Sequence, residues 1–387
     1  NAAGVQTDFV EYADAGEWAT RERGPDDRGH QGWIWSDDHD GGGSSLEVVQ
    51  LGLPNNHGQN WAASITMGGT PGVANSVADA NSDVAPLIVS IAHTPAIPRS
   101  TEPVVVTARL IDELSTGVTG TVRWRVDGSP NFSSIPIADN GIGADTTAGD
   151  GRFTGVIPAQ PDGTVVEWYV SASDVTSNVR THPSPRLPSV LQQTNLLYQV
   201  DNDFDPNALP AVGEMSQYRL IITEVERAEL EDIGDGSDTE ARTNAQMNGT
   251  FIALTSNGID VRYNVGLRNR GNGSRNNPPN NIRVNIPSDN PWKGIDQFNL
   301  NTQFTPVQLA GLKLYAATGL VSEDSQAVVV QVNGSNLAGT GSPAYGVYVQ
   351  FEASNSDFTD NHFPDDGNGN LYRGTHEVSP SADLEYL

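Results

Sequence analysis

The sequence has 387 residues, of which 48 are acidic and 21 basic, so the formal net charge is -27. A field of that sign repels phosphate backbones and anionic lipid surfaces, which excludes nucleic acid as a natural partner. The chain contains no cysteine, which excludes a disulfide scaffold, a thiolate zinc site and cysteine catalysis. No apolar run approaches the ~20 residues that a helix needs to cross a bilayer, so we expect no transmembrane segment.

Glycine and proline divide the sequence into short alternating apolar runs. The 40 glycines and 24 prolines are typical of strands joined by turns, so we predict a mainly β fold with a C-terminal α+β part. The chain begins with Asn1 and shows no signal-peptide pattern, so we expect a processed piece of a longer protein. Changes in composition predict three domains separated by linkers: 1–77, linker 78–85, 86–200, linker 201–214, and 215–387.

The first domain carries the stretches SSLEVV, NNHGQNWAAS and GGTPGVANS in that order. These stretches resemble the closing half of a lamin-tail domain, a small β-sandwich appended to many bacterial exported proteins. The resemblance implies a binding or bridging role without catalysis, in a domain whose opening strands are incomplete before Asn1. Its histidines lack the spacing of metal ligands, and we interpret them as surface residues: His30, His39 and His57.

The second domain contains runs of strand length at 101–112, 120–130 and 163–174, with turn residues at their ends. Their spacing suits a β-sandwich. The pattern DNG…GDGRFTGVIPA…GTVVEWYV resembles an immunoglobulin-like or fibronectin-type module, which implies a second interaction domain.

A glycine-rich loop in this second domain offers hard oxygen ligands at Asp139, Asn140, Asp145 and Asp150. Such ligands on a loop suit Ca²⁺, although the spacing is not that of an EF-hand and the terminal Glu is missing. The alternative is a long hairpin in which Asp and Asn cap turns through their own backbone. The sequence favours the turn and keeps calcium as a candidate cofactor.

The third domain combines strand-like runs with two helical patterns. The stretch 215–233 becomes helix-like near Glu224, and the stretch 305–320 has Pro306 near its start and Gly319 as a C-cap. Four stretches, in this order, resemble the N-terminal part of the CotH (spore coat protein H-like) kinase family: YRLIITEVERAELE, VRYNVGLRNRGNGSR, WKGIDQFNLNTQ and GVYVQFEASNSDFTDNHFPDDGNGNLYRG. The resemblance implies a kinase-like N-lobe.

By this resemblance the loop after VRYNVGL faces a nucleotide, because its glycines let the backbone approach a phosphate and its arginines donate charge-assisted hydrogen bonds. The candidate nucleotide-binding residues are Arg268, Arg270, Gly271, Asn272, Gly273, Ser274, Arg275 and Arg283. The alternative is a polar loop whose arginines keep a strand edge soluble. The chain's two lysines, Lys293 and Lys313, are not placed as a phosphate-binding lysine is expected to be.

Two functions follow from these patterns. The favoured one is an exported bacterial structural or interaction protein, secreted or at the cell surface after loss of an export signal, with a kinase-like lobe that lacks a complete active site. Its expected partners are other surface or extracellular proteins or polysaccharide, and self-assembly is a further prediction. The alternative is the front portion of a secreted CotH-type kinase that uses ATP and Mg²⁺ to phosphorylate Ser or Thr of surface proteins.

Overall fold

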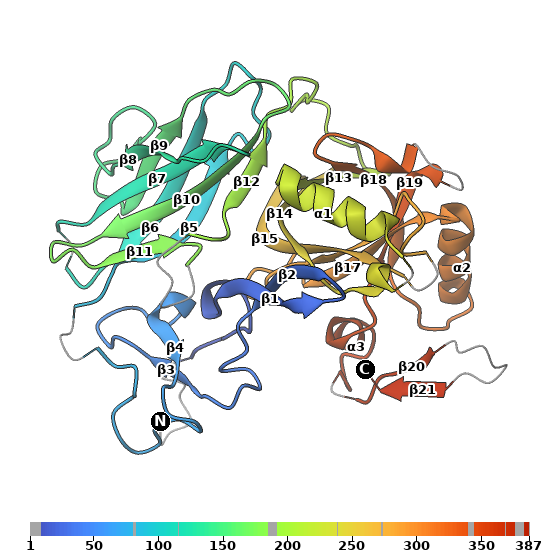
Figure 1. Cartoon of the computed structure of the whole chain (residues 1–387), viewed down its shortest axis with the longest axis horizontal. Helices are drawn as coiled ribbons and strands as arrows, with labels where there is room; N and C mark the ends of the chain where they lie inside the picture. The colour runs from blue at the N-terminus through green and yellow to red at the C-terminus, as the bar shows by residue number, and fades with distance from the viewer. Residues whose placement is uncertain are drawn as a thin grey trace.

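The protein consists of three bodies that lie against one another in a computed structural model (Figure 1). In Figure 1 the first segment is blue, a β-sandwich is cyan to green, and a barrel with its helices is yellow to red. No helix of the described part of the chain is long and apolar enough to span a membrane. The structure describes residues 9–386 except for these ranges: 80–82, 115, 185–191, 238, 272–273, 340–343, 368 and 376–382.

The first segment differs from the β-sandwich expected for 1–77, because its described residues 9–79 form two separate two-stranded pairs. The physical reason lies in Trp33, which is buried against the barrel and whose backbone N–H donates to the carbonyl of Gln246 (2.8 Å). The hairpin of residues 21–35 thus packs its apolar side chains against the third segment and does not form a core of its own. Its elements are η1 (Gly16–Trp18), β1 (Arg21–Asp27), β2 (His30–Trp35), β3 (Leu46–Val48), η2 (Gly58–Asn60) and β4 (Trp61–Ala63).

The second segment is a sandwich of two antiparallel sheets. One sheet has the order β5-β6-β9, and the other has the order β11-β10-β7-β8, with β12 also pairing with β10. Alternate residues of β6 and β10 point inward, and Val106, Trp168 and Val170 are fully buried between the sheets. The strands are β5 (Leu87–Thr94), β6 (Val104–Ile111), β7 (Thr119–Val126), β8 (Ser133–Ile137), β9 (Arg152–Ile157), β10 (Val165–Ser173), β11 (Val179–His182) and β12 (Leu196–Gln199).

The third segment is built on a closed barrel of order β13-β14-β15-β16-β17-β19-β18, which closes through a parallel pairing of β13 with β18. Its interior is filled by large side chains, among them Tyr218, Phe251 and Phe298. A kinase-like N-lobe is not shown, because the sheet closes on itself around this filled core. The strands are β13 (Ser216–Ile222), β14 (Met247–Thr255), β15 (Gly258–Arg270), β16 (Asn281–Asn285), β17 (Gln297–Gln303), β18 (Ser325–Val332) and β19 (Ala344–Glu352).

Helices cover parts of this barrel. Thr223 caps α1 through its hydroxyl, which accepts from the N–H of Glu226, and Ile233 of this helix joins the barrel core. The second helix lies on the outside of the barrel and buries only Thr305 among its residues. The remaining elements are α1 (Glu224–Asp235), η3 (Glu240–Arg242), α2 (Thr305–Ala317), η4 (Leu337–Gly339), α3 (Ser356–His362), β20 (Tyr372–Thr375) and β21 (Asp383–Tyr386).

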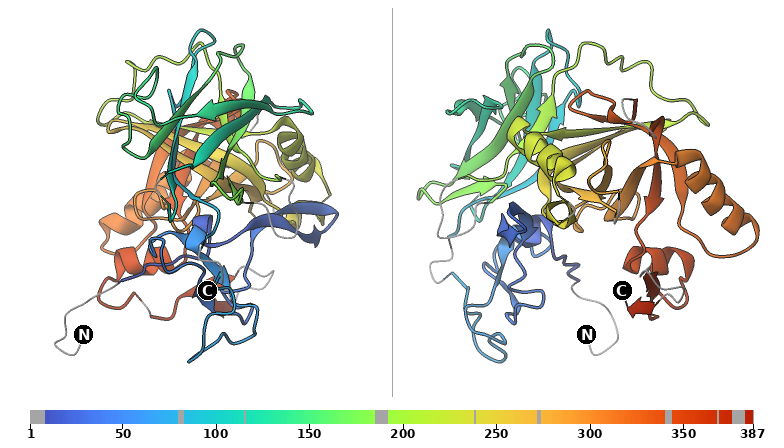
Figure 2. Two further views of the ribbon diagram at one scale, coloured as in Figure 1. Left: turned by 90° about the vertical axis from the view of Figure 1, so that its left-hand side faces the viewer. Right: turned by 45° about the vertical axis from the view of Figure 1, so that its right-hand side comes forward.

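Sandwich and barrel are joined by an apolar interface. Strand β14 is buried along its whole length because one face points into the barrel and the other carries Ile252 and Leu254 against Leu197 of the sandwich. Tyr263 of β15 reaches further and packs edge-on against Trp168 in the sandwich core. The mainly β fold predicted from the sequence is confirmed, and the figures agree that the barrel and sandwich lie side by side (Figures 1 and 2).

Candidate functional site

The arginines singled out in the sequence lie where β15 ends and β16 begins. Val265 and Leu267 of β15 point into the barrel core, so alternation places Arg268 and Arg270 on the outer face. Arg268 pairs directly with Arg283 across the β15–β16 ladder, with two like charges opposite each other. The fold therefore brings Arg268, Arg270, Arg275 and Arg283 together in one arginine cluster.

Arg275 is held by oxygens of its own chain. Its Nε donates to the carbonyl of Gly271 (2.7 Å) and its Nη1 to the carbonyl of Thr243 (2.6 Å), while Nη2 reaches Asn244 Oδ1 (3.2 Å). All three nitrogens of this guanidinium thus have protein partners, and the side chain ties the loop to the segment after η3.

The other three arginines also donate to side-chain amides. Arg268 Nη1 donates to Asn244 Oδ1 (3.0 Å), Arg270 Nη1 to Asn301 Oδ1 (2.6 Å) and Arg283 Nε to Asn299 Oδ1 (3.1 Å). Arg270 also lies 5.2 Å from the centre of the Phe351 ring, at a distance that allows a cation–π contact. These amide partners are neutral, so the positive charge of the cluster is not cancelled by them.

Burial and mutual repulsion lower the pKa of the clustered arginines. The pKa of Arg268 falls to about 10, first because of burial and then because of Arg283, Arg275 and Arg270. The pKa of Arg270 falls to about 10 for the same kind of reason. Both side chains remain protonated at neutral pH, so the cluster stays cationic on a protein whose net charge is strongly negative.

Gly271 has a local structural role in the loop. Its φ of +119° is one that residues with a side chain rarely adopt, and an added Cβ would lie 2.3 Å from Ser274 Oγ. Ser274 Oγ in turn accepts a hydrogen bond from Asn281 Nδ2 (3.2 Å). Asn272 and Gly273, also candidate nucleotide-binding residues, lie outside the described residues.

The structure adds two arginines that sequence reasoning missed. Burial is the main reason that the pKa of Arg275 is lowered, Asp27 raises it, and the charges of Arg242 of η3 and Arg28 at the tip of the β1–β2 hairpin lower it further. Asp27 also accepts from the N–H of Asn244 (2.7 Å), which joins the hairpin to the same surface. Nothing in the sequence marks these residues, because Arg242 stands 33 positions before Arg275 and Arg28 stands much further away, so they come together only through tertiary packing.

The acids that follow the loop in sequence are committed to local structure. Glu352 is buried at the end of β19, where its Oε2 accepts from the N–H of Asp324 (2.8 Å) and lies 2.7 Å from Nε2 of His362. Asp357 at the start of α3 accepts from the N–H of Asp296 (2.9 Å). Among the described residues, neither joins a group of three potential metal ligands.

The candidate calcium loop does bring three acids together. Oxygen atoms of Asp139, Asp145 and Asp150 lie within 4.8 Å of one another, between β8 and β9 of the sandwich. Asp145 accepts from the N–H groups of Asn140, Gly141 and Thr147, and Asp139 accepts from those of Gly149 and Gly151. These bonds are the turn caps expected under the alternative interpretation. The N–H of Gly141, followed by those of Thr147 and Asn140, lowers the pKa of Asp145.

Asn140 is not among the converging oxygens, and its Oδ1 accepts the N–H of Ile142 in a local turn (3.0 Å). The three carboxylates nevertheless fit Ca²⁺ in donor type, because hard oxygens are its preferred ligands. The loop therefore combines a turn that is closed by its own backbone with a convergence of carboxylate oxygens.

The comparison with protein families identifies one part of the chain. The model described as CotH kinase protein matches residues 267–385. The match includes the arginine cluster and most of the barrel, and it confirms the CotH resemblance for that part, which is less than a third of the chain. The lamin-tail-like and immunoglobulin-like resemblances of 1–77 and 86–200 stay predictions.

No curated protein matches this chain. Solved structures that show some similarity include a cycloalternan-forming enzyme from Listeria monocytogenes in complex with a pentasaccharide substrate, at 8% identity and a TM-score of 0.20. Another is an uncharacterised Listeria monocytogenes protein with glucose, magnesium and calcium, at 10% identity and a TM-score of 0.20. Each alignment covers 55% of this chain and 20% of the other, so the chain spans about a fifth of their length. Similarity at this level shows neither a common fold nor a common function.

Proposed function

We propose that this chain is part of an exported bacterial structural or interaction protein, secreted or at the cell surface, whose CotH-like part supports binding without transferring phosphate. Its partners would be other extracellular proteins, copies of itself or polysaccharide. The observation that carries the proposal is the state of the arginine cluster, whose guanidinium groups donate to oxygens of their own chain.

The needs of phosphoryl transfer support this choice. A kinase places carboxylates that hold Mg²⁺ beside the phosphates, together with a positioned base. In the part of the chain that the structure describes, the one group of three acids with metal-ligand geometry is Asp139, Asp145 and Asp150, which belongs to a loop of the sandwich and not to the barrel. The lysines give no help either, since Lys293 lies against the Trp292 ring (4.6 Å) and Lys313 is exposed on α2.

The alternative function is the front portion of a secreted CotH-type kinase that uses ATP and Mg²⁺. The family match over residues 267–385 favours it. So does helix α2, on which Val307, Leu314 and Tyr315 are exposed to 72%, 67% and 57%. Under this alternative, further kinase residues after Leu387 in the parent protein would cover the apolar helix and supply the missing carboxylates.

Calorimetry with ATP and Mg²⁺ on the native protein, paired with its intact mass, separates the two functions. We expect no heat of binding and no transfer of labelled phosphate to Ser or Thr, whatever the intact mass of the native protein. Binding of ATP, weakened at least tenfold in Arg270→Gln and unchanged in the exposed Lys313→Gln, would refute the proposal and establish the nucleotide site. A larger mass with phosphate transfer would establish the kinase.

A further inference from the structure

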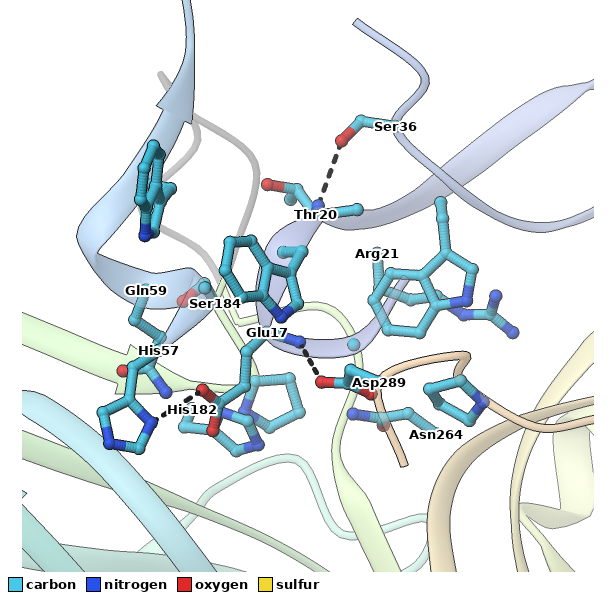
Figure 3. Close-up of a pocket in the computed structure, with 18 of the residues that line it drawn as sticks. Glu17, Thr20, Arg21, Ser36, His57, Gln59, His182, Ser184, Asn264 and Asp289 are labelled. Atoms are coloured by element: carbon cyan, nitrogen blue, oxygen red, sulfur yellow. Dashed lines mark hydrogen bonds and ion pairs between the residues drawn. The ribbon is translucent and has the colours of Figure 1, made fainter. Parts of the chain in front are cut away.

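A cavity of about 1160 Å³ lies where the three bodies meet, away from the arginine cluster (Figure 3). The first segment contributes η1, η2 and the starts of β1 and β4, the sandwich contributes β11 and the middle of β5, and the barrel contributes β15 and the loop after β16. The volume exceeds the ~300–1,000 Å³ typical of pockets for small molecules. It therefore has room for an extended ligand.

Three of the chain's seven tryptophans line this cavity: Trp18, Trp35 and Trp61. The rings of Trp18 and Trp61 lie 6.1 Å apart at 36°, and Trp61 Nε1 is already used in a hydrogen bond to the carbonyl of Asn55 (2.8 Å). Trp35 stands under the guanidinium of Arg21 at 4.8 Å. Indole faces give broad, flat apolar areas that suit the C–H face of a ring in a ligand.

Hydrogen-bond donors and acceptors line the cavity together with these rings. Glu17 lies 3.6 Å from His57 Nδ1, and its backbone N–H donates to Asp289 Oδ2 (2.7 Å), which ties the first segment to the barrel (Figure 3). Burial lowers the pKa of His182, so this ring is neutral at pH 7. The wall thus offers carboxylate acceptors and imidazole groups, with no excess of positive charge that would draw in an anion.

The backbone is bent where two strands border the cavity. The β5–β6 register shifts between Val89 and Ala92, and Ser90 there has a φ of +53°. The β14–β15 register shifts opposite Asn264, which has a φ of +51°. A residue with a side chain in this left-handed region costs on the order of 1 kcal/mol or more, and such strain tends to be kept where it places a side chain for function.

Two buried side chains at the cavity have polar atoms without a hydrogen-bond partner among the described residues. Asn264 is 7% exposed and its Oδ1 has no hydrogen-bond partner within the described part of the protein. Arg21 is 2% exposed, and its Nε and Nη2 are unpaired in the same sense. Leaving buried polar atoms unpaired costs free energy, so an acceptor and donors in this position indicate that a ligand completes the hydrogen bonds.

We propose that this cavity binds a neutral oligosaccharide, with sugar rings stacked on the tryptophans and hydroxyl groups bonded to Asn264, Arg21 and Glu17. A hydroxyl is both donor and acceptor, so it can satisfy the unpaired carbonyl oxygen of Asn264 and the unpaired nitrogens of Arg21 alike. Phosphorylated or carboxylated ligands fit less well, because the lining acids Glu17, Asp38 and Asp289 offset the charges of the three lining arginines and the whole protein is strongly acidic. The lining arginines are Arg21, Arg180 and Arg262. The site holds whether or not the arginine cluster binds a nucleotide.

The test uses the whole 387-residue chain and neutral hexasaccharides of glucose, N-acetylglucosamine, mannose, galactose and xylose, with oligogalacturonate and ATP as anionic comparisons. Binding is followed by tryptophan fluorescence and by calorimetry. The first variant is Asn264→Gly, which removes the amide and suits the positive φ, so the fold is kept. The matched control is Ser177→Gly, which makes the same change at another positive φ (72°) outside the cavity.

We expect at least one neutral hexasaccharide to bind with a change in fluorescence, and Asn264→Gly to weaken that binding about tenfold at an unchanged Tm. Ser177→Gly should bind like the wild type, and Trp61→Ala should reduce the fluorescence change, since Trp18 and Trp35 still line the cavity. Binding of none of the neutral sugars, or equal binding by Asn264→Gly and the wild type, would overturn the proposal. Binding of oligogalacturonate or ATP in place of neutral sugars, with loss in Asn264→Gly, would overturn the ligand class.

Discussion

The arginine cluster and the junction cavity are opposite kinds of polar region. The cluster is conspicuous in the sequence, with four arginines in an acidic chain, yet their guanidinium groups donate to carbonyls and amides of the same protein. The cavity has no continuous motif, since its lining comes from three segments, yet it contains Asn264 and Arg21 with buried polar atoms that have no partner within the described residues.

The difference shows that residue type and availability are separate properties. Arginines and glycines in a loop indicate an anion site only if their donors remain free after folding, and folding here uses many of them to fix the loop. A buried amide oxygen without a partner is a stronger sign of a ligand, because the free energy lost on burial is otherwise not recovered. Hydrogen bonding within the folded chain therefore decides which region we assign to ligand binding.

The largest expected effect concerns Glu226, which holds the hairpin that borders both regions. Glu226 is 7% exposed, accepts from Trp33 Nε1 and from the N–H of Asn248 (3.1 Å), and lies 3.9 Å from Arg23 Nη2. Removing these acceptors in Glu226→Ala leaves buried donors unpaired and should lower the free energy of unfolding by about 3 kcal/mol. Urea denaturation measures the change in the free energy of unfolding. Hexasaccharide binding should be lost as well, because Arg21 lies on β1, the strand that carries Arg23.

Glu229→Ala is the matched control on the same helix. Its carboxylate is 38% exposed and contacts His30 Nδ1 (2.7 Å), so we expect a loss below about 1 kcal/mol. Equal losses in the two variants would show that the hairpin is not anchored through Glu226, and the common border between cluster and cavity would lose its support.

Arg275 tests whether the arginine cluster is committed to structure. Arg275→Ala leaves the carbonyls of Thr243 and Gly271 without their donor, so we expect the free energy of unfolding to fall by about 2 kcal/mol. Arg242→Ala, at an exposed neighbouring position, should change it by less than about 0.5 kcal/mol. If Arg275→Ala were as stable as Arg242→Ala, the guanidinium would be free for a ligand and the contrast with the cavity would fail.

The cavity should also differ from the cluster in its response to pH. Burial raises the pKa of Asp289 from 3.8 to about 6, with Glu17 and Asp14 adding repulsion, whereas Arg268 and Arg270 stay charged throughout this range. Between pH 4 and pH 6 the folded chain thus holds more protons at Asp289 than the unfolded chain does. The free energy of unfolding therefore falls as the pH rises through this window.

Asp289→Asn removes this contribution. Between pH 4.5 and pH 7.5 the free energy of unfolding of the variant should therefore fall by roughly 1–2 kcal/mol less than that of the wild type. The variant must be compared with the wild type because Asp296 and Glu226 also have raised pKa values, of about 7. They make the free energy of unfolding fall with rising pH in both proteins. Asp38→Asn, an exposed lining residue, is the control. Parallel pH profiles for wild type and Asp289→Asn would show that Asp289 is in contact with water and not buried in the cavity wall.

Much of the fold could be predicted because strand patterns are local. The alternation in VVVTARLI and the turns around it are present in the sequence, and they correspond to β6 with its alternately buried residues. The helix after Glu224 and the helix with Pro306 near its start were also found. Closure of the barrel could not be predicted, since the parallel pairing of β13 with β18 joins residues more than 100 positions apart.

The site was predicted less well for the same physical reason. The loop arginines were marked by composition, but whether Arg275 would meet a phosphate or the carbonyl of Thr243 depends on a chain segment 32 residues away. Asn264 gave no signal, because it stands in the middle of a strand and a bulge that aims a side chain has no reliable motif. Trp33 packs on the barrel, where its indole donates to Glu226, a residue 193 positions away in the sequence.

The smallest expected effect concerns the acidic loop of the sandwich, which shares features with both the arginine cluster and the cavity. Like the arginine cluster it was marked by the sequence and is closed by its own backbone, but its three carboxylates lie within 4.8 Å of one another and have the donor type that suits Ca²⁺. We expect 5 mM Ca²⁺ to stabilise the wild type by about 1 kcal/mol, as a dissociation constant near 1 mM implies, measured as a rise in Tm. Asp150→Asn should abolish that rise at little cost to the apo protein, because the Asp150 carboxylate accepts the local N–H of Arg152 (2.9 Å), a bond that an amide oxygen can also accept. If Ca²⁺ does not change the Tm of the wild type, the loop is like the arginine cluster: its polar groups are conspicuous in the sequence but stabilise the fold.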